Sequence, residues 1–225
     1  MKRFVILLII LGFMLGGTAL APALQSGKNT PSQTIKIGFV GDSITAGAKG
    51  THNAVQGEIA ALGNGYEAVN RGMNSATTTD WLPGKTYFES TLEVFRSEGV
   101  RIVSVMLGVN DAARLKLPPE QYADNMRKIV DALLEDTDIR LVVLNYPTYT
   151  QRGDRVEKDL DAYVKELDKL ANGSSIVTGD TKAYDYFKSH TDELVDGVHP
   201  TDTGYKALGE LWAEALQPIL TTHSL

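Results

Sequence analysis

Apolar and polar residues alternate along this chain in a pattern that predicts parallel strands separated by helices. Runs that are apolar on both faces, such as residues 101–107 and 139–145, are typical of strands buried inside a sheet. The segments between these runs carry apolar residues at helical spacing and have prolines or glycines near their ends. The predicted strands are 35–40, 67–70, 101–107, 139–145 and 175–177, and the predicted helices are 52–62, 87–98, 118–135, 155–170 and 203–220.

This alternation predicts an α/β fold. Parallel strands need helical crossovers, and the helices then cover both faces of the sheet. We therefore predict a three-layer α/β/α sandwich with a five-stranded parallel sheet and flavodoxin-like topology. Ligands of such sheets bind beyond the carboxyl ends of the strands. Ser43, Gly72 and Asn110 follow the first, second and third predicted strands, so all three are expected at this edge.

The N-terminal segment has the layout of a secretory signal peptide. Lys2 and Arg3 precede an apolar run over 4–15, and the small-residue triplet 19–21 follows it. The alternative is an uncleaved membrane anchor, because the apolar stretch continues loosely to Leu24. We expect a cleaved signal peptide or an anchor over 1–24, a polar linker over 25–34 and a folded domain over 35–225. Both alternatives place the domain outside the cytoplasm, and cleavage would make the protein secreted.

Composition narrows the class of protein. The 225 residues, 43% apolar and 22% charged, suit one globular domain with a full core. The net charge of −6, with no basic run beyond Lys2 and Arg3, argues against a nucleic-acid partner. The absence of cysteine excludes disulfides, thiolate metal sites and a cysteine nucleophile. The Asp and His residues of the chain lack metal-ligand spacing, so we expect neither a metal nor another cofactor.

The chain has one histidine with an acidic residue at a short fixed offset. Of His52, His190, His199 and His223, only His199 has this context, with Asp196 three residues before it in a loop of turn-forming residues. Such a histidine can take the proton of a serine hydroxyl while the aspartate orients its ring, and Ser43 is the candidate serine. A solvated turn that caps the next helix would explain the same residues.

A serine activated in this way can attack an ester. Ester hydrolysis also needs hydrogen-bond donors for the oxyanion that develops in the transition state. The candidates are the backbone N–H of Ser43, the backbone N–H of Gly72 and the side-chain amide of Asn110. Gly72 lacks a Cβ, so a substrate could approach its backbone closely. An ordinary strand-to-helix turn at Gly72 and an Asx-turn at Asn110 are the alternative explanations. We expect Asp42 and Asp111 to be structural residues that fix the loops presenting Ser43 and Asn110.

Four short blocks in a fixed order carry a resemblance to a known family. They are GDSIT at 41–45, NRG at 70–72, GVND at 108–111 and the Asp196-x-x-His199 pair. Over residues 35 to about 220 the chain resembles the GDSL or SGNH hydrolases. The resemblance implies a catalytic triad of Ser43, His199 and Asp196 and an oxyanion hole at Ser43, Gly72 and Asn110. In the second block the family often has another glycine three residues after the first, where this chain has Ser75.

The substrate class is the least determined part. The family hydrolyses esters of lipids, thioesters, and acyl groups on sugars. The chain has no long apolar insertion that would build a lipid-binding lid, and Trp81, Tyr146 and Tyr149 lie in loops expected to rim the pocket. We therefore predict a secreted serine esterase for a small acyl ester or acylated saccharide, with carbohydrate O-deacetylation as the leading activity. The alternatives are a lysophospholipase or acyl thioesterase of the same fold, and an inactive glycan-binding domain.

Overall fold

Five parallel strands form the central sheet of the computed structural model, which describes residues 34–135 and 138–223. They are β1 (Ile35–Gly41), β2 (Tyr66–Asn70), β3 (Ile102–Met106), β4 (Leu141–Leu144) and β5 (Ile176–Thr178). Their order in the sheet is β2-β1-β3-β4-β5, which is the flavodoxin-like order. The predicted fold class and topology are therefore confirmed. The segment 1–24, and with it the question of signal peptide or anchor, lies outside the described residues.

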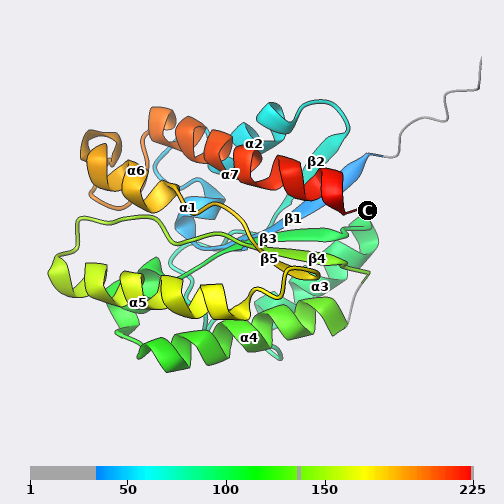
Figure 1. Cartoon of the computed structure of the whole chain (residues 1–225), viewed down its shortest axis with the longest axis horizontal. Helices are drawn as coiled ribbons and strands as arrows, with labels where there is room; N and C mark the ends of the chain where they lie inside the picture. Colours follow the sequence, from blue (N-terminus) through cyan, green and yellow to red (C-terminus); the bar gives the residue numbers. More distant parts are fainter. Residues whose placement is uncertain (1–33, 136–137, 224–225) are drawn as a thin grey trace, which may run out of the picture. The chain divides into compact units, whose positions relative to one another are not determined.

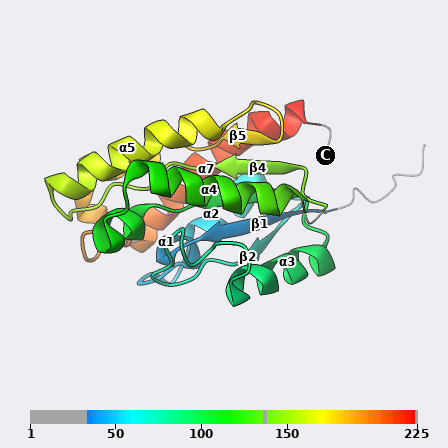
Figure 2. The same ribbon diagram turned by 90° about the horizontal axis from the view of Figure 1, so that it is seen from below.

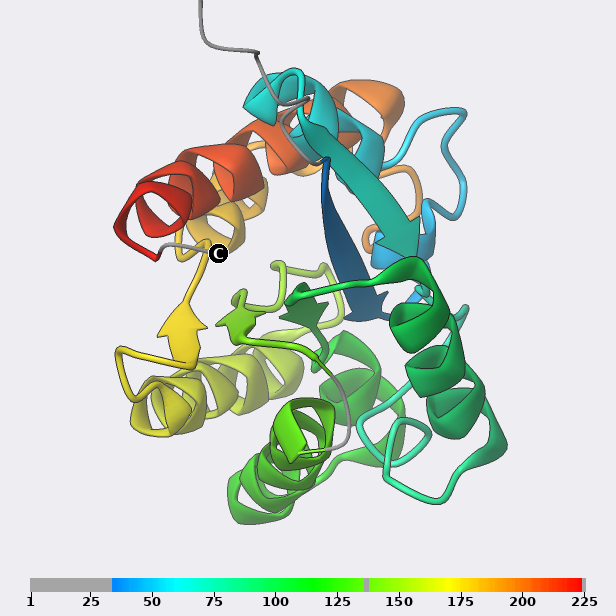
Figure 3. The ribbon, with the colours of Figure 1, turned by 90° about the vertical axis from the view of Figure 1, so that its right-hand side faces the viewer.

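Helices cover both faces of this sheet. On one face lie α1 (Ser43–Ala46), α2 (Ala54–Leu62), α6 (Ala183–Ser189) and α7 (Asp202–Thr222), and on the other α3 (Thr86–Glu98), α4 (Pro119–Glu135) and α5 (Asp154–Leu170) (Figures 1 and 2). Each face has its own cluster of buried apolar residues. The cluster on the first face includes Phe39 and Trp212, and the cluster on the second includes Phe95 and Met126. Seen along the strands, the three layers are separate (Figure 3).

The sequence pattern missed the shortest elements. Besides α1 and α6, the structure has a π-helix, η1 (Asp111–Leu115), and a 3₁₀ turn, η2 (Thr191–Glu193). Elements of three to seven residues are too short to show a helical period. Capping contacts set the start of two of the predicted helices. Asn53 and Gln56 form a capping box at α2, and Thr201 caps α7 by accepting a hydrogen bond from Gly204 N. Within 34–135 and 138–223, no helix is long and apolar enough to cross a bilayer.

The register of the central strands brings two of the sequence blocks together. Gly41, the last residue of β1, pairs with Met106, the last residue of β3. The chain therefore leaves both strands at the same level, carrying Ser43 from one and Asn110 from the other. Gly41 itself has no room for a side chain, since a Cβ there would lie 2.0 Å from Thr45 Oγ1.

Candidate active site

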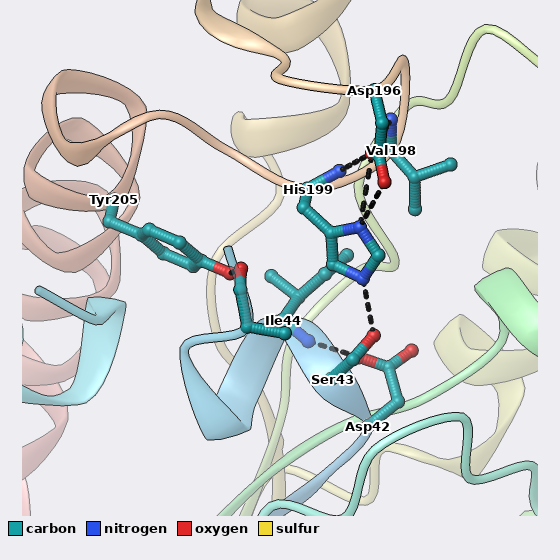
Figure 4. A network of polar contacts seen from close by, with 8 residues as sticks. Asp42, Ser43, Ile44, Asp196, Val198, His199 and Tyr205 are labelled. Carbon is teal, nitrogen blue, oxygen red and sulfur yellow. Dashed lines mark hydrogen bonds and ion pairs between the residues drawn. The ribbon is translucent and has the colours of Figure 1, made fainter. Parts of the chain in front are cut away.

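Ser43 opens the four-residue helix α1 directly after β1. The Asp42 carboxylate caps this helix by accepting a hydrogen bond from Ile44 N at 2.9 Å, and Gly47 ends it in the left-handed conformation. From α7, Tyr205 donates its hydroxyl to Ala48 O at 2.7 Å and holds the far end of the turn (Figure 4). The serine is thus presented on a short, braced turn and stays 8% exposed.

A continuous chain of polar contacts links Ser43 to His199 and Asp196. Ser43 Oγ lies 2.8 Å from His199 Nε2, and His199 Nδ1 lies 2.9 Å from Asp196 Oδ2 and 3.0 Å from Asp196 Oδ1 (Figure 4). This is the geometry in which a histidine takes a serine proton while a carboxylate fixes the imidazole tautomer. The structure therefore brings together the three residues expected to form the triad.

The loop that carries Asp196 is shaped to hold its carboxylate on the histidine ring. Gly197 has a φ of 78°, and Asp196 Oδ1 accepts hydrogen bonds from Val198 N at 3.2 Å and His199 N at 3.0 Å. Burial by itself would raise the pKa of Asp196, but these N–H groups and the His199 ring lower the pKa to about 2. The carboxylate is therefore ionised at neutral pH and can accept a hydrogen bond from the Nδ1–H of His199.

Asn110 reaches the same edge from the end of β3. Its Nδ2 lies 3.0 Å from Ala76 O and 3.5 Å from Asp42 Oδ2. The first contact fixes the plane of the amide, whereas the second is at the limit of hydrogen bonding. One amide hydrogen thus anchors the side chain to the loop after β2, and the other can be donated to a substrate oxygen.

Gly72 lies at the predicted edge of the sheet, against α1, and its N–H has a partner within the protein. Its N–H donates to Asn70 Oδ1 at 2.8 Å, and Asn70 Nδ2 donates in turn to Thr45 O at 2.9 Å. A Cβ on Gly72 would lie 2.4 Å from Ala46 N. Glycine is therefore required here because the loop passes against the backbone of α1. The Gly72 N–H is donated to Asn70 Oδ1 in this structure, and its role as an oxyanion donor stays a prediction.

Two buried carboxylates support the site. Asp111 is fully buried and accepts hydrogen bonds from Thr78 N at 3.0 Å and from Thr78 Oγ1 at 2.5 Å, and Asn125 Nδ2 donates to the same hydroxyl at 2.9 Å. Burial raises the pKa of Asp42 to about 7 and that of Asp111 to about 6. Their contacts fix the loops beside Ser43 and Asn110, as expected of structural residues. Nothing in the local sequence pointed to Thr78 as the partner of Asp111.

Trp81 does not form part of the rim that we expected, whereas Tyr146 and Tyr149 are partly exposed. Trp81 is fully buried, donates its Nε1 to Gly41 O at 3.1 Å and packs edge-on against Tyr87. Its large apolar ring is better accommodated beside β1 than in solvent. Tyr146 donates its hydroxyl to Asp168 at 2.5 Å, and Tyr149 packs edge-on against Tyr184. Trp81 is therefore not available to stack on a sugar ring.

The Ser–His–Asp contacts, on an α/β/α fold, have the geometry of a serine-hydrolase triad. The sequence pattern of the GDSL-like Lipase/Acylhydrolase family matches residues 39–207. The chain belongs to this family and is a carboxylic ester hydrolase. No curated protein sequence matches it.

Solved structures with the same fold include several esterases. The acetylxylan esterase Axe2 from Geobacillus stearothermophilus is 20% identical, with a TM-score of 0.66 over 82% of this chain and 95% of that one. Est24, a carbohydrate acetylesterase from Sinorhizobium meliloti, is 18% identical, with a TM-score of 0.61 over 83% and 100%. A lipase/acylhydrolase from Enterococcus faecalis is 22% identical, with a TM-score of 0.60 over 85% and 100%. Three Axe2 structures carry catalytic mutations, at a serine, at an aspartate and at a histidine three residues after that aspartate.

Proposed function

We propose that this protein hydrolyses carboxylic esters through an acyl-enzyme on Ser43, with His199 as general base and Asp196 as its orienting acid. The observation that carries the proposal is the unbroken contact chain from Ser43 Oγ through the two His199 nitrogens to Asp196, at 2.8 and 2.9 Å. The catalytic mutations described for Axe2 support it, because an aspartate and a histidine three residues apart recur in this chain.

The mechanism has two matching halves. Ser43 Oγ attacks the acyl carbon while His199 Nε2 accepts the hydroxyl proton. The carbonyl oxygen becomes an oxyanion, which the Ser43 N–H and the Asn110 amide stabilise. Gly72 could join them only if its N–H were released from Asn70. His199 then protonates the leaving alcohol as the C–O bond breaks. A water molecule attacks the acyl-enzyme in the same way and releases the acid and free Ser43.

We propose a short acyl group on a carbohydrate as the substrate. The acetylxylan and carbohydrate acetylesterases of the same fold support this choice, as does the lack of an inserted apolar lid in the sequence.

We also propose that residues 1–24 direct the protein out of the cytoplasm, as a cleaved signal peptide, and that 25–34 link this segment to the SGNH hydrolase domain over 35–225. N-terminal sequencing of the exported protein tests the cleavage.

A lipase or acyl thioesterase activity is the second candidate. Leu115 and Val195 are 44% and 54% exposed, the large apolar side chains that stand out most from the described surface. Leu115 ends the π-helix that follows Asn110, and Val195 directly precedes Asp196. Exposed apolar side chains close in the sequence to residues of the site would suit a longer acyl chain.

One experiment separates these activities. Hydrolysis of p-nitrophenyl acetate, butyrate and octanoate, and acetate release from acetylated xylan, are measured for the wild type, Ser43→Ala and the exposed-serine control Ser97→Ala. We expect the rate to fall with chain length, and Ser43→Ala to lose about 10³-fold or more while the control does not. A rate that rises toward octanoate would favour the lipase or thioesterase. No turnover by the folded wild type, with retained binding to xylan, would favour a glycan-binding domain.

A further inference from the structure

One turn of the chain after β3 holds three nearly consecutive residues of the loop after β2. Asn110 Nδ2 donates to Ala76 O at 3.0 Å, and Asp111 accepts from Thr78 N at 3.0 Å. Arg114 Nη1 donates to Ser75 O at 2.5 Å. The first two contacts involve residues of the GVND block, whereas no sequence block singled out Arg114. The loop 75–78 is therefore held along its whole length by side chains from residues 110–114.

The two segments joined in this way are both locally strained. Ser75 has a φ of 63°, and Lys116, which ends η1, has a φ of 55°. Of the residues that the structure describes, Lys49 is the one other non-glycine residue with a positive φ. This conformation is unfavourable for residues that have a Cβ and persists where the surroundings impose it. The π-helix η1 is itself a rare element that is frequent at functional sites, and it carries the Arg114 side chain to Ser75 O.

We propose that Arg114 is a positioning residue of the ester hydrolysis, which holds the strained turn at Ser75 so that Ala76 O keeps the Asn110 amide in its working orientation. This inference rests on the proposed function, because it assigns a purpose to the orientation of Asn110.

The path from Arg114 to the reacting atoms is short. Ser75 O and Ala76 O belong to successive peptide units, so a turn that relaxed at Ser75 would move the Ala76 carbonyl. Asn110 would then lose its 3.0 Å contact and keep the 3.5 Å contact with Asp42 Oδ2. An oxyanion donor is effective only when it is held in place before the reaction. Losing the orientation of Asn110 should therefore lower kcat, which reports contacts made in the transition state, and should change KM much less.

The substitution of glycine at Ser75 gives the sharpest test. Glycine adopts a positive φ without strain, so the turn should then need less support. Arg114→Ala is measured in the wild-type background and in the Ser75→Gly background, with Arg114→Lys as the conservative variant and the exposed Arg127→Ala on α4 as the matched control. On p-nitrophenyl acetate we expect Arg114→Ala to lower kcat about tenfold with KM within about twofold, and only about threefold in the Ser75→Gly background. Arg114→Lys should recover part of the loss, and Arg127→Ala should have no effect.

The outcomes separate this inference from the proposed function. An unchanged kcat in Arg114→Ala, or the same loss in both backgrounds, would overturn the positioning role while Ser43→Ala still abolished activity. An inactive wild type, or an active Ser43→Ala variant, would overturn the proposed function. Urea unfolding of the same four proteins of the cycle measures the coupling of Arg114 to the strain at Ser75 even then, and additive changes in stability would contradict the support of that turn by Arg114. If Arg114→Ala failed to fold, the cycle would be measured with Arg114→Lys.

Discussion

Glu58 is a buried carboxylic acid whose ionisation should set much of the pH dependence of stability. It lies on α2 with 1% of its surface exposed, and its Oε2 has no hydrogen-bond partner among the described residues. The neighbouring helix α7 approaches so closely that a Cβ on Gly209 would lie 2.7 Å from Glu58 N. Burial, and then the negative charge of Asp180, raise the pKa of Glu58 to about 8 from an ordinary value of 4.5.

The sign of the effect follows from the two pKa values. The unfolded chain releases the Glu58 proton near pH 4.5 and the folded protein near pH 8, so between these values the unfolded state is the more ionised. The protein is therefore most stable, as far as Glu58 is concerned, below pH 4.5, and loses stability as the pH rises to 8. Between pH 5 and 8 this loss amounts to about 3–4 kcal/mol, a large share of the roughly 5–15 kcal/mol that stabilises a typical protein.

The variant Glu58→Gln tests this, because glutamine has nearly the same shape and does not titrate. Urea unfolding of the wild type and of the variant is measured at pH 5, 6, 7 and 8. At each pH the free energy of unfolding of the variant is subtracted from that of the wild type, and this difference is followed against pH. The subtraction removes the contribution of the other carboxylates, which titrate equally in both proteins. We expect the wild type to lose about 3–4 kcal/mol relative to Glu58→Gln across this range. Parallel curves would refute the reasoning.

Two further predictions concern the proposed catalytic groups. Asn110→Ala should lower kcat on p-nitrophenyl acetate by about 10²–10³-fold with a smaller change in KM, because the amide acts on the transition state. An unchanged kcat would remove Asn110 from the oxyanion hole. Asp196→Asn should lower kcat by about 10⁴-fold, because an amide no longer holds the His199 tautomer that leaves Nε2 free to accept a proton. A rate near that of the wild type would contradict its role as the orienting acid.

Hydrophobic periodicity is sufficient to predict the buried strands and the long helices of this protein. β1, β3 and β4 are apolar runs buried by helices on both faces. The ends of β1 and β3 were predicted to within one residue, whereas β4 begins two residues later than predicted. The helices α4 and α5, at 17 residues each, are long enough for their apolar stripe to be unmistakable. The four-residue α1, by contrast, exists because Asp42 caps it and Gly47 ends it.

Trp81 illustrates a failure of a different kind. The residue lies in a segment without helical or strand periodicity, so its neighbours in the sequence do not show whether it is buried. The structure places its ring under the end of β1, 40 residues away in the chain, with its N–H on Gly41 O. An aromatic side chain in a loop can be buried in the core or exposed at the rim of the site. Which of these occurs depends on the distant backbone that lies beside it.

The sequence by itself determined the layer architecture and the edge of the sheet at which the site lies. Both follow from local patterns. The spacing of hydrophobic residues identifies buried strands and amphipathic helices, and parallel strands have their carboxyl ends at one edge of the sheet. The tertiary structure alone decided which polar groups are available there. It brought the predicted pair Ser43 and His199, 156 residues apart, into contact, and it alone gave the Gly72 N–H to Asn70 and joined Arg114 to Ser75. A hydrogen bond depends on distance and angle between atoms, and those are fixed only once distant segments have packed.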